Sequence, residues 1–349
     1  MEERKGGNIY GAHRVVSPKG ALPQAAYRVD NSLPIFDNEI LIDVLTLNVD
    51  SASFHQIKEQ AGKDPRKVGE IIMATVRERG KQHNPVTGSG GMLIGTVAQI
   101  GSNYHGRLKL EPGDRVATLV SLSLTPLLID EIKAVHMESE QVDISGKAVL
   151  FESGVAAKLP SDMPEKVALA ALDVAGAPAQ TAQLVKPGQT VLVIGGGGKS
   201  GTLCLYVARK KAGKKGKVIG FAHSDASFLR MKDLGFADIC LQGTATNPLE
   251  VYEKVLAATG GELADIVINC ANIPGTELAS ILPAKQDGLV YFFSMATSFT
   301  AAALGAEGIG HGATMLIGNG YCPAHDEYTL EVLRESPALM KFFTETYGK

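Results

Sequence analysis

The first 150 residues contain short apolar segments of the kind that form β-strands. Residues 39–49 begin with alternating apolar and polar positions and then become apolar throughout, which predicts a strand that enters a hydrophobic core. Residues 91–101 and 113–120 predict further strands joined by turn residues. Residues 65–80 instead repeat apolar positions at helical spacing and end in Arg and Gly, which predicts a helix with a stop signal. We therefore expect a β-rich first domain with long loops.

After Leu159 the pattern changes to strands and helices that alternate. Ser161, followed by Pro164 and Glu165, opens a predicted helix that extends to Leu172. The later predicted elements are strands at 190–195, 217–222, 238–241, 265–271 and 288–295, and helices at 201–213, 226–235 and 247–261. Continuous apolar strands that alternate with helices are typical of a parallel sheet covered on both faces. The sequence therefore predicts an α/β protein in which a β-rich domain precedes a doubly wound parallel sheet.

The segment TVLVIGGGGKSG (190–201) has the glycine spacing of a dinucleotide-binding turn, because Gly196, Gly198 and Gly201 satisfy GxGxxG. It follows a predicted strand and opens a predicted helix, which is the context that lets a pyrophosphate approach the helix N-terminal amides. A plain strand-to-helix turn is the alternative interpretation. The residues that we expect to bind the dinucleotide at this turn are Gly195, Gly198, Lys199, Ser200 and Gly201.

Lys199 belongs to a partial match to a second phosphate motif, the Walker pattern GxxxxGK[ST]. Gly198, Lys199 and Ser200 match its end, but Val193 stands where the pattern requires a glycine, so a P-loop is excluded. Two roles for Lys199 stay open, a cation near the phosphates and a solvated surface residue.

The predicted strand at 217–222 ends without the acid that commonly binds the adenosine ribose about 20 residues beyond the glycines. Ala222 occupies that position, and His223, Ser224 and Asp225 follow it. His223 and Ser224 are candidate cofactor contacts, and His223 is placed to lie near a 2′-phosphate. Asp225 either reaches the ribose or caps the next helix, which is the role that we expect. The local chemistry leaves NAD and NADP both open.

Residues after the later strands are further cofactor candidates, because ligands of doubly wound sheets bind at the carboxyl ends of the strands. The candidates are Asn269, Cys270, Ala271 and Asn272, then Ser294 and Met295, and finally Gly318, Asn319 and Gly320. We expect Cys270 to be a small buried residue, and no cysteine lies in a recognisable nucleophile setting.

Charge and cysteine content exclude several classes of protein. The 349 residues include 34 Lys and Arg against 37 Asp and Glu, which argues against nucleic acid or an acidic membrane surface as the main partner. Four cysteines lie far apart without a CxxC pair, which excludes a disulfide scaffold and a thiolate zinc site by spacing. The first ten residues carry no secretory signal, and the uncharged run at 288–306 predicts a buried strand and a helix. We expect a soluble, cytoplasmic protein.

The whole chain resembles the medium-chain dehydrogenase/reductase superfamily. The segments that carry the resemblance are EILIDVLTLNVDSASF (39–54), PVTGSGGMLIGTVAQIG (85–101), LEPGDRV (110–116), VKPGQTVLVIGGGGKSG (185–201) and LRMKDLGFADIC (229–240). The resemblance implies a GroES-like catalytic domain at 1–160 and 320–349, and a Rossmann dinucleotide-binding domain at 161–319. It also implies a homodimer or homotetramer.

Within this superfamily, residues 11–31, the insertion at 57–84 and FESGVAAKLP (151–160) resemble the L-erythro-3,5-diaminohexanoate dehydrogenase family of lysine fermentation. The resemblance implies an NAD-dependent amine dehydrogenase that converts a small diamino acid, (3S,5S)-3,5-diaminohexanoate, to 5-amino-3-oxohexanoate and ammonia. Zinc-dependent relatives carry Gly-His-Glu where this chain has Gly-Ser-Gly (88–90), and the relatives' four-cysteine loop is absent. We therefore expect no metal.

Deamination requires acid–base groups, because an amine releases a hydride only after its ammonium form has lost a proton. Without zinc, a carboxylate or a histidine has to move this proton. The resemblance places Asp173 beside the nicotinamide, Glu152 beside the substrate pocket, and Asp50, Ser53 and His55 after a strand end that faces the cofactor. Arg14 suits the substrate carboxylate, because a guanidinium binds it through two hydrogen bonds. The candidate catalytic residues are Asp173, Glu152 and His55, and the candidate substrate-binding residues are Asp50, Ser53 and Arg14.

Ordinary structural roles are the alternative for each of these residues, and two other functions fit the same pattern. One is an NADPH-dependent enone or quinone reductase, which shares the metal-free core. The other is a nucleotide-binding regulatory protein with an inactive pocket. Carboxylates in the pocket favour the amine substrate, whereas an apolar pocket favours the quinone.

Overall fold

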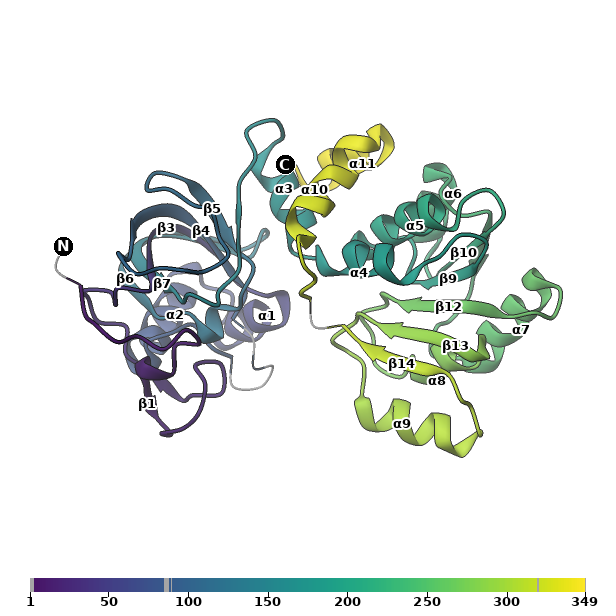
Figure 1. The fold of residues 1–349 in the computed structure, drawn as a ribbon, viewed down its shortest axis with the longest axis horizontal. Helices are drawn as coiled ribbons and strands as arrows, with labels where there is room; N and C mark the ends of the chain where they lie inside the picture. Colours follow the sequence, from purple (N-terminus) through teal and green to yellow (C-terminus); the bar gives the residue numbers. More distant parts are fainter. Residues whose placement is uncertain (1–2, 85–87, 89, 319, 349) are drawn as a thin grey trace. The chain divides into compact units, whose positions relative to one another are not determined.

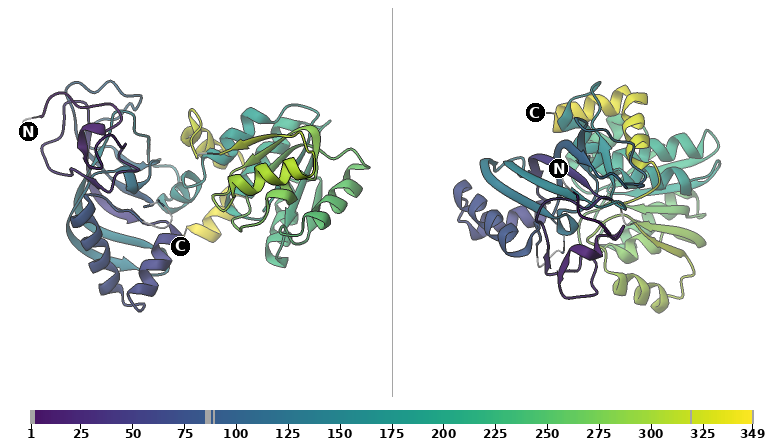
Figure 2. Two further views of the ribbon diagram at one scale, coloured as in Figure 1. Left: turned by 90° about the horizontal axis from the view of Figure 1, so that it is seen from below. Right: turned by 60° about the vertical axis from the view of Figure 1, so that its left-hand side comes forward.

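The computed structural model describes residues 3–84, 88, 90–318 and 320–348, and the chain divides into two compact units, 1–160 and 161–349 (Figure 1, Figure 2). Each unit has its own main sheet and its own hydrophobic core. The first unit is rich in antiparallel strands, and the second alternates strands with helices, as the hydrophobic pattern predicts.

Antiparallel strands form the main sheet of the first unit in the order β6-β7-β3-β4-β5-β8. They are β3 (Ile40–Asn48), β4 (Met92–Ile100), β5 (Arg115–Thr118), β6 (Leu127–His136), β7 (Gln141–Leu150) and β8 (Ala156–Lys158). The predicted strand at 39–49 is confirmed as β3, between β4 and β7. The hydrophobic pattern did not predict β6, β7 or β8. Strand β6 lies at the sheet edge, and charged residues interrupt its apolar positions.

Two helices and the N-terminal segment cover opposite faces of this sheet. Helix α1 (Ser51–Gln60) contributes Phe54, and helix α2 (Pro65–Arg79) contributes Ile72, to the buried cluster that contains Ile42 of β3, and α2 packs on β6. On the other face, Leu41 of β3 lies in a smaller cluster with Ile35 of the N-terminal segment. That segment and the loops contain β1 (Val15–Ser17), β2 (Arg28–Val29) and the 3-10 turns η1 (Ala12–Arg14) and η2 (Leu122–Leu124).

Parallel strands form the sheet of the second unit in the order β11-β10-β9-β12-β13-β14. They are β9 (Thr190–Ile194), β10 (Lys217–Ala222), β11 (Ile239–Gln242), β12 (Ala264–Asn269), β13 (Ala284–Phe292) and β14 (Thr314–Ile317). The strand order reverses between β9 and β12, which confirms the predicted Rossmann topology. Ligands of such sheets bind in the crevice at this reversal, outside the carboxyl ends of the strands.

Helices cover both faces of the parallel sheet (Figure 1). One face carries α4 (Gly176–Leu184), α5 (Lys199–Ala212) and α6 (Asp225–Leu234), and the other carries α7 (Pro248–Thr259), α8 (Glu277–Ile281) and α9 (Phe299–Gly308). Val191 and Val193 of β9 belong to the first core, and Leu192 and Ile194 belong to the second. Because successive strand residues point to opposite faces, one continuous apolar run supplies both cores.

The C-terminal helices pack within the second unit. Helix α10 (His325–Glu335) packs on α4 and on α3 (Glu165–Leu172), and α11 (Pro337–Tyr347) packs on α3. Thr329 donates a hydrogen bond of 3.0 Å to the carbonyl oxygen of Ala175, and the backbone of Gly320 lies directly against Gly176. Residues 320–349 therefore form part of the second unit, which corrects the expectation that they return to the first domain.

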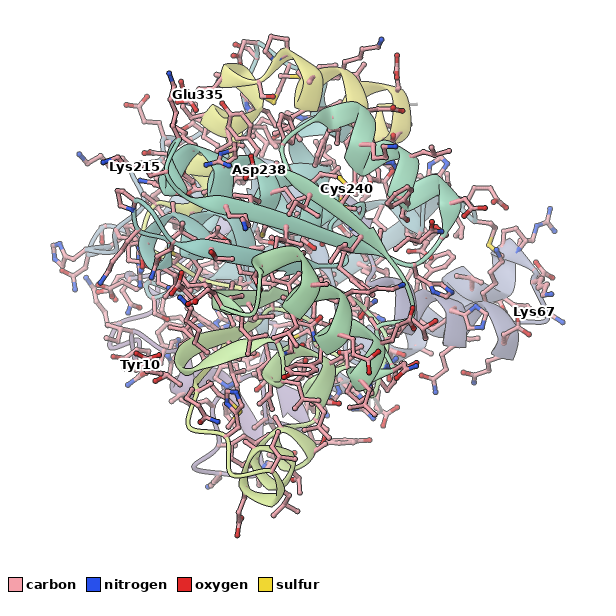
Figure 3. All side chains as sticks on the ribbon, turned by 90° about the vertical axis from the view of Figure 1, so that its right-hand side faces the viewer. Tyr10, Lys67, Lys215, Asp238, Cys240 and Glu335 are labelled. Atoms are coloured by element: carbon pink, nitrogen blue, oxygen red, sulfur yellow. The ribbon has the colours of Figure 1, made fainter. Side chains whose placement is uncertain are left out.

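The uncharged run at 288–306 forms the second half of β13 and most of α9, which confirms the prediction of a strand followed by a helix. Throughout the described ranges, no helix is both long enough and apolar enough to cross a bilayer. The surface of the second unit carries ion pairs, including Asp238 with Arg209 and Glu335 with Lys210. Figure 3 labels the two carboxylate residues, Asp238 and Glu335.

Candidate functional site

Glycines at the carboxyl end of β9 bring three backbone segments into close contact. Gly195 has a φ of +79°, and a Cβ there would lie 2.9 Å from the amide nitrogen of Ala271. A Cβ on Gly201 would lie 2.1 Å from the carbonyl oxygen of Gly195, so only glycine lets α5 begin this close to the turn. The amides of Gly195 and Gly196 donate to the carbonyl oxygen of Phe221 over 2.9 and 3.0 Å, which fixes the turn against β10.

Helix α6 holds the middle of the same turn. A Cβ on Gly197 would lie 2.2 Å from the carbonyl oxygen of Ser227, and Arg230 donates to the Gly197 carbonyl oxygen over 2.6 Å. The Arg230 guanidinium also lies 4.9 Å from the centre of the Phe342 ring. The glycine spacing does not predict Arg230, because it does not specify which side chain of the next helix supports the turn.

The N-terminus of α5 presents backbone amides without a side-chain cap. Gly198 is the N-cap residue, and the amide of Thr202 makes a helical hydrogen bond of 2.9 Å to its carbonyl oxygen. That bond is the first one of the helix. The three preceding amides have no acceptor within the helix, and they belong to Lys199, Ser200 and Gly201. Their partial positive charge suits a phosphate group. This turn therefore fits the diphosphate of a dinucleotide.

Lys199 makes a contact that the glycine motif does not predict. Its ammonium nitrogen lies 2.5 Å from a carboxylate oxygen of Asp173 and 5.7 Å from the centre of the Tyr347 ring. Asp173 is the C-cap residue of α3, and its side chain is 44% exposed. The structure thus joins a candidate catalytic carboxylate to the first residue of the dinucleotide helix.

The end of β10 carries no acid at the ribose position, because Ala222 occupies it and is buried. The His223 ring lies 3.2 Å from the carbonyl oxygen of Gly243 in the loop after β11. Ser224 caps α6 by accepting a hydrogen bond from an amide of the first turn, whereas Asp225 accepts one from the side chain of Gln242 over 2.7 Å. The cap is therefore Ser224, which corrects the role expected of Asp225.

A buried amide organises the loop after β12. Asn269 donates to the hydroxyl oxygens of Thr276 and Ser280 over 2.7 and 2.9 Å, and it accepts from the amide of Ala271 over 2.9 Å. Asn269 is fully buried, so it anchors the loop rather than contacting a ligand. The predicted cofactor residues that follow are at least partly exposed, and they are Cys270, Ala271 and Asn272.

The candidates after β13 lie at the same edge of the sheet, because the carboxyl ends of parallel strands meet there. The Ser294 hydroxyl is partly exposed and accepts a hydrogen bond of 3.2 Å from the amide of Ala296. Met295 is 88% exposed. Gly318 and Gly320, the candidates after β14, are described, whereas Asn319 lies outside the described residues.

In the first unit, the N-terminus of α1 holds two of the predicted substrate residues. The Asp50 carboxylate caps the helix by accepting hydrogen bonds from the amide and the hydroxyl of Ser53, over 3.0 and 2.5 Å. Ser53 is fully buried, whereas His55 is exposed. The structure therefore brings Asp50 and Ser53 together and places His55 on the outer side of α1.

Glu152 lies at the opposite end of β3 from Asp50. The antiparallel register places Glu152, which follows β7, beside the start of β3, whereas Asp50 follows its end. Strand β3 has 9 residues, so the two carboxylates lie roughly 25 Å apart at the usual strand rise. Glu152 instead accepts a hydrogen bond of 3.0 Å from Asn38. One catalytic site cannot contain Glu152 together with Asp50 and His55, which corrects the predicted catalytic set.

Arg14 is fully buried and has structural partners. Its guanidinium donates to both carboxylate oxygens of Glu39 over 2.6 Å, and to the carbonyl oxygens of Asp30 and Ser32 over 2.9 and 3.0 Å. Burial opposes the ionisation of Glu39, but hydrogen bonds from Arg14 and His13 outweigh it and hold the pKa of the carboxyl below its usual value. The predicted role of Arg14 in binding a substrate carboxylate is therefore wrong. The residue ties the N-terminal segment to the start of β3.

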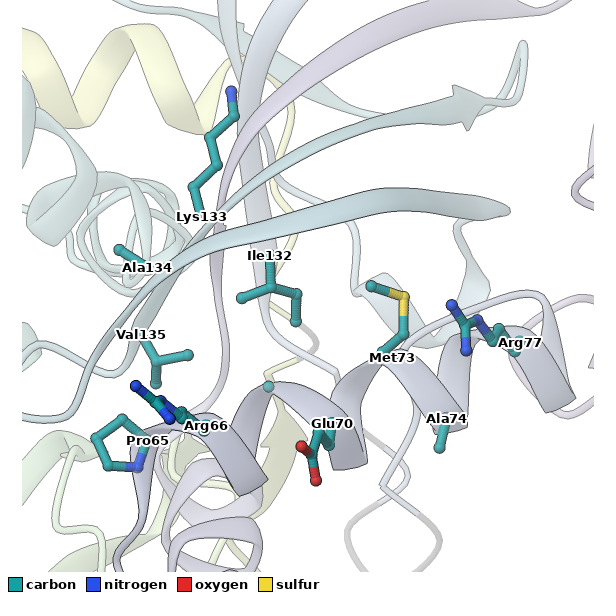
Figure 4. A pocket seen from close by; sticks show the side chains of 11 residues that line it. Pro65, Arg66, Glu70, Met73, Ala74, Arg77, Ile132, Lys133, Ala134 and Val135 are labelled. Atoms are coloured by element: carbon teal, nitrogen blue, oxygen red, sulfur yellow. The ribbon is translucent and has the colours of Figure 1, made fainter.

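A hollow of 570 Å³ lies between α2 and β6 of the first unit (Figure 4). Its lining includes Arg66, Met73 and Ile132, and it contains none of the predicted site residues. Across the part of the chain that the structure describes, no group of three His, Cys, Asp or Glu side chains is arranged to hold a metal ion.

Comparison with known proteins shows the family. The family model described as "L-erythro-3,5-diaminohexanoate dehydrogenase N-terminal domain" matches residues 13–160. The L-erythro-3,5-diaminohexanoate dehydrogenase of Acetoanaerobium sticklandii is 56% identical over 338 residues, which cover 97% of this chain and 98% of that protein. The protein of the same name from Fusobacterium nucleatum subsp. nucleatum is 55% identical over 343 residues, which cover 98% and 99%. The chain belongs to the L-erythro-3,5-diaminohexanoate dehydrogenase family.

Membership in this family makes the chain an oxidoreductase of the dehydrogenase type. A crystal structure of an alcohol dehydrogenase from Thermotoga maritima has a similar fold, with a TM-score of 0.54 over 89% of this chain and 85% of that one. Because only 18% of the residues are identical, the similarity concerns the fold alone. That fold combines a GroES-like β-rich domain with a Rossmann parallel sheet, as the sequence predicts.

The close glycine contacts of this diaminohexanoate dehydrogenase family member predict a specific loss on substitution. We expect Gly201→Ala to weaken dinucleotide binding about tenfold or more and to destabilise the protein by about 1–3 kcal/mol, because the new methyl group collides with the Gly195 carbonyl. Gly308→Ala is the matched control, since a Cβ there meets nothing within 4 Å. Cofactor titration and thermal unfolding measure both effects. Unchanged dinucleotide binding in Gly201→Ala would contradict the assignment of the turn.

The buried Arg14–Glu39 pair predicts a large loss of stability. Arg14→Met should lower the free energy of unfolding by about 3–5 kcal/mol, because it leaves the buried Glu39 carboxylate without its main partner. The control is Arg28→Met, which removes an exposed arginine and should change the free energy by about 0.5 kcal/mol or less. Urea denaturation measures both variants. Equal stability of the two would show that the pair does not hold the N-terminal segment.

Proposed function

We propose that the chain oxidatively deaminates (3S,5S)-3,5-diaminohexanoate with NAD, yielding 5-amino-3-oxohexanoate and ammonia, as a step of lysine fermentation. The observation that carries the proposal is identity of 56% and 55%, over nearly the whole length, to two proteins named as this dehydrogenase. The uncapped amides at the start of α5 support it, because the reaction needs a dinucleotide. Overall, substrate ammonium, NAD and water give the ketone, ammonium, NADH and a proton.

The glycine turn is the part of the chain that would hold the cofactor diphosphate. The contacts at Gly195 and Gly201 leave no room for side chains. The amides of Lys199 and Ser200 have no acceptor within the helix and can donate to an anion. When bound, the nicotinamide supplies the hydride acceptor. We place the adenosine ribose beside His223 and Ser224, and we retain NAD as the cofactor from the family resemblance.

Asp173 is the residue to which we assign the proton transfers. It accepts the proton that the substrate C3 ammonium must lose and releases this proton to solvent, and as a carboxylate again it later removes a proton from the water that attacks the iminium carbon. Its ion pair with Lys199 supports this assignment, because the contact fixes the carboxylate at the start of the helix that would bind the diphosphate. Lys199 is thus a positioning residue in this proposal.

Within the first unit, the polar residues that we retain as candidates lie at the N-terminus of α1. Asp50 is assigned to a substrate ammonium group, and the Ser53 hydroxyl orients the Asp50 carboxylate. His55, which is exposed on the same helix, is assigned a secondary role in proton exchange. Glu152 and Arg14 are left out of the proposed site, because Glu152 lies at the far end of β3 and Arg14 is fully buried with Glu39.

An assay with (3S,5S)-3,5-diaminohexanoate tests the function directly. With NAD, we expect NADH to accumulate together with an equal amount of ammonia. Parallel reactions replace NAD by NADP, and the diamine by a quinone with NADPH. Turnover of the quinone without turnover of the diamine would reject the proposal in favour of a reductase. Dinucleotide binding without any turnover would indicate a regulatory protein.

The role of Asp173 predicts a rate effect without a binding effect. Asp173→Asn should lower kcat by about 10²–10⁴-fold, because the amide cannot accept the proton, while the NAD dissociation constant stays within about twofold. Asp162→Asn is the matched control, since Asp162 is an exposed carboxylate of the same unit in an ion pair of 2.8 Å with Arg334. Steady-state kinetics and NADH titration separate the two effects. A kcat for Asp173→Asn equal to that of Asp162→Asn would refute the assignment.

A further inference from the structure

Two cysteine side chains meet behind the proposed dinucleotide turn. Cys204 lies on α5 and Cys270 directly follows β12, and their Sγ atoms are 3.8 Å apart. They are 66 positions apart in the sequence, so only the fold brings them together. Both are free thiols in this structure.

The two thiols differ in their surroundings. Cys204 is completely buried, and its Sγ lies 3.4 Å from the hydroxyl of Thr181. Burial raises the pKa of the Cys204 thiol, so it does not ionise readily. Cys270 is partly exposed at the carboxyl end of the sheet. An oxidant in solution therefore reaches Cys270 first, and Cys204 stands next to it as a resolving thiol.

Cys270 is also part of the backbone that shapes the proposed cofactor site. Its amide donates to the carbonyl oxygen of Ile194 over 2.9 Å, immediately before Gly195. The next residue, Ala271, presses its backbone against Gly195 so closely that no side chain fits there. Cys204 lies in the second turn of α5, whose first amides face the proposed diphosphate. A bond between the two sulfurs would therefore link both sides of the crevice.

We propose that Cys204 and Cys270 are a reversible redox pair, which a peroxide converts to a disulfide and which thereby weakens dinucleotide binding. Formation of the disulfide involves residues of the second unit alone and does not depend on the proposed function. Only the expected loss of dinucleotide affinity rests on the proposed function. The pair thus constitutes an oxidative modification site next to the cofactor turn.

The oxidation balances with one molecule of hydrogen peroxide. The Cys270 thiolate attacks the peroxide, an S–O bond forms, the O–O bond breaks, and hydroxide leaves as water after taking up a proton. The Cys204 sulfur then attacks Cys270, the S–S bond forms, the S–O bond breaks, and the thiol proton leaves with the hydroxide as a second water. Two thiols lose two electrons, and peroxide gains them. A dithiol such as dithiothreitol reverses the change by thiol–disulfide exchange.

Bond formation has to change the geometry of the turn. A disulfide holds its sulfur atoms about 2 Å apart, so the observed 3.8 Å has to shorten by roughly 1.8 Å. Cys204 is buried within a packed helix, whereas Cys270 lies in a loop and is partly exposed. We therefore expect the Cys270 loop to move. That movement shifts Ala271 against Gly195, where the backbones already touch. We therefore expect a loss of dinucleotide affinity.

Peptide mapping tests the bond itself. Reduced full-length protein is treated with hydrogen peroxide, blocked with an alkylating reagent and digested. We expect a linked peptide that contains Cys204 and Cys270, lighter by two hydrogen atoms than the sum of its parts, and no link to Cys240 of strand β11 (Figure 3) or to Cys322. Absence of the linked peptide would overturn the proposal, as would a link that involves Cys240 or Cys322.

Dinucleotide titration tests the consequence, with each protein compared before and after peroxide. The dissociation constant of NADH should rise about tenfold or more on oxidation and return after dithiothreitol. Cys204→Ala and Cys204→Ser should both lose the peroxide effect, whereas Cys240→Ser should keep it in full. If the linked protein binds NADH as tightly as the reduced protein, the regulatory part is refuted. If the reduced protein binds no dinucleotide, the proposed function fails as well, while the peptide map still decides the bond.

Discussion

Close contact between backbones at Gly195, Gly201 and Ala271 is the constraint on which the second unit depends. Strand β9, helix α5 and the loop after β12 meet at a distance that excludes every side chain larger than hydrogen. Because the N-cap of α5 is Gly198, the first amides of the helix have no side-chain cap, and they follow β9 at the point where the strand order reverses. The hydrogen bonds to Phe221 and the Arg230 side chain then hold the turn in place.

Charge at this turn is arranged by contacts that the fold supplies. Lys199 is the first residue of α5, and its ammonium forms an ion pair with Asp173 at the C-terminus of α3. The Tyr347 ring of α11 lies near the same ammonium. Three helices therefore position a single carboxylate. An exposed ion pair contributes little to stability. Its importance for the proposed chemistry lies in placing Asp173 beside the helix that would hold the cofactor.

The first unit shows how sheet register decides which residues can act together. Asp50, Glu152 and Arg14 all looked like candidates for one substrate pocket. The antiparallel pairing of β3 with β7 places Asp50 and Glu152 at opposite ends of a nine-residue strand. Arg14 lies on the same side as Glu152, next to Glu39 at the start of β3, where it is buried in an ion pair. Arg14 and Glu152 therefore lie at one end of the strand, where Arg14 stabilises the domain. Asp50 and Ser53 lie at the other end.

The sequence alone determined the alternation of strands and helices after residue 189, the parallel sheet and the position of the glycine turn, because these follow from local periodicity and from the conformations that only glycine adopts. It did not reveal strands β6, β7 and β8, the packing of α10 and α11 in the second unit, or the partners of Arg14, Lys199 and Cys204. Those features depend on contacts between residues far apart in the chain. Such contacts exist only after strand register and helix packing have set the distances, so tertiary structure alone decided them.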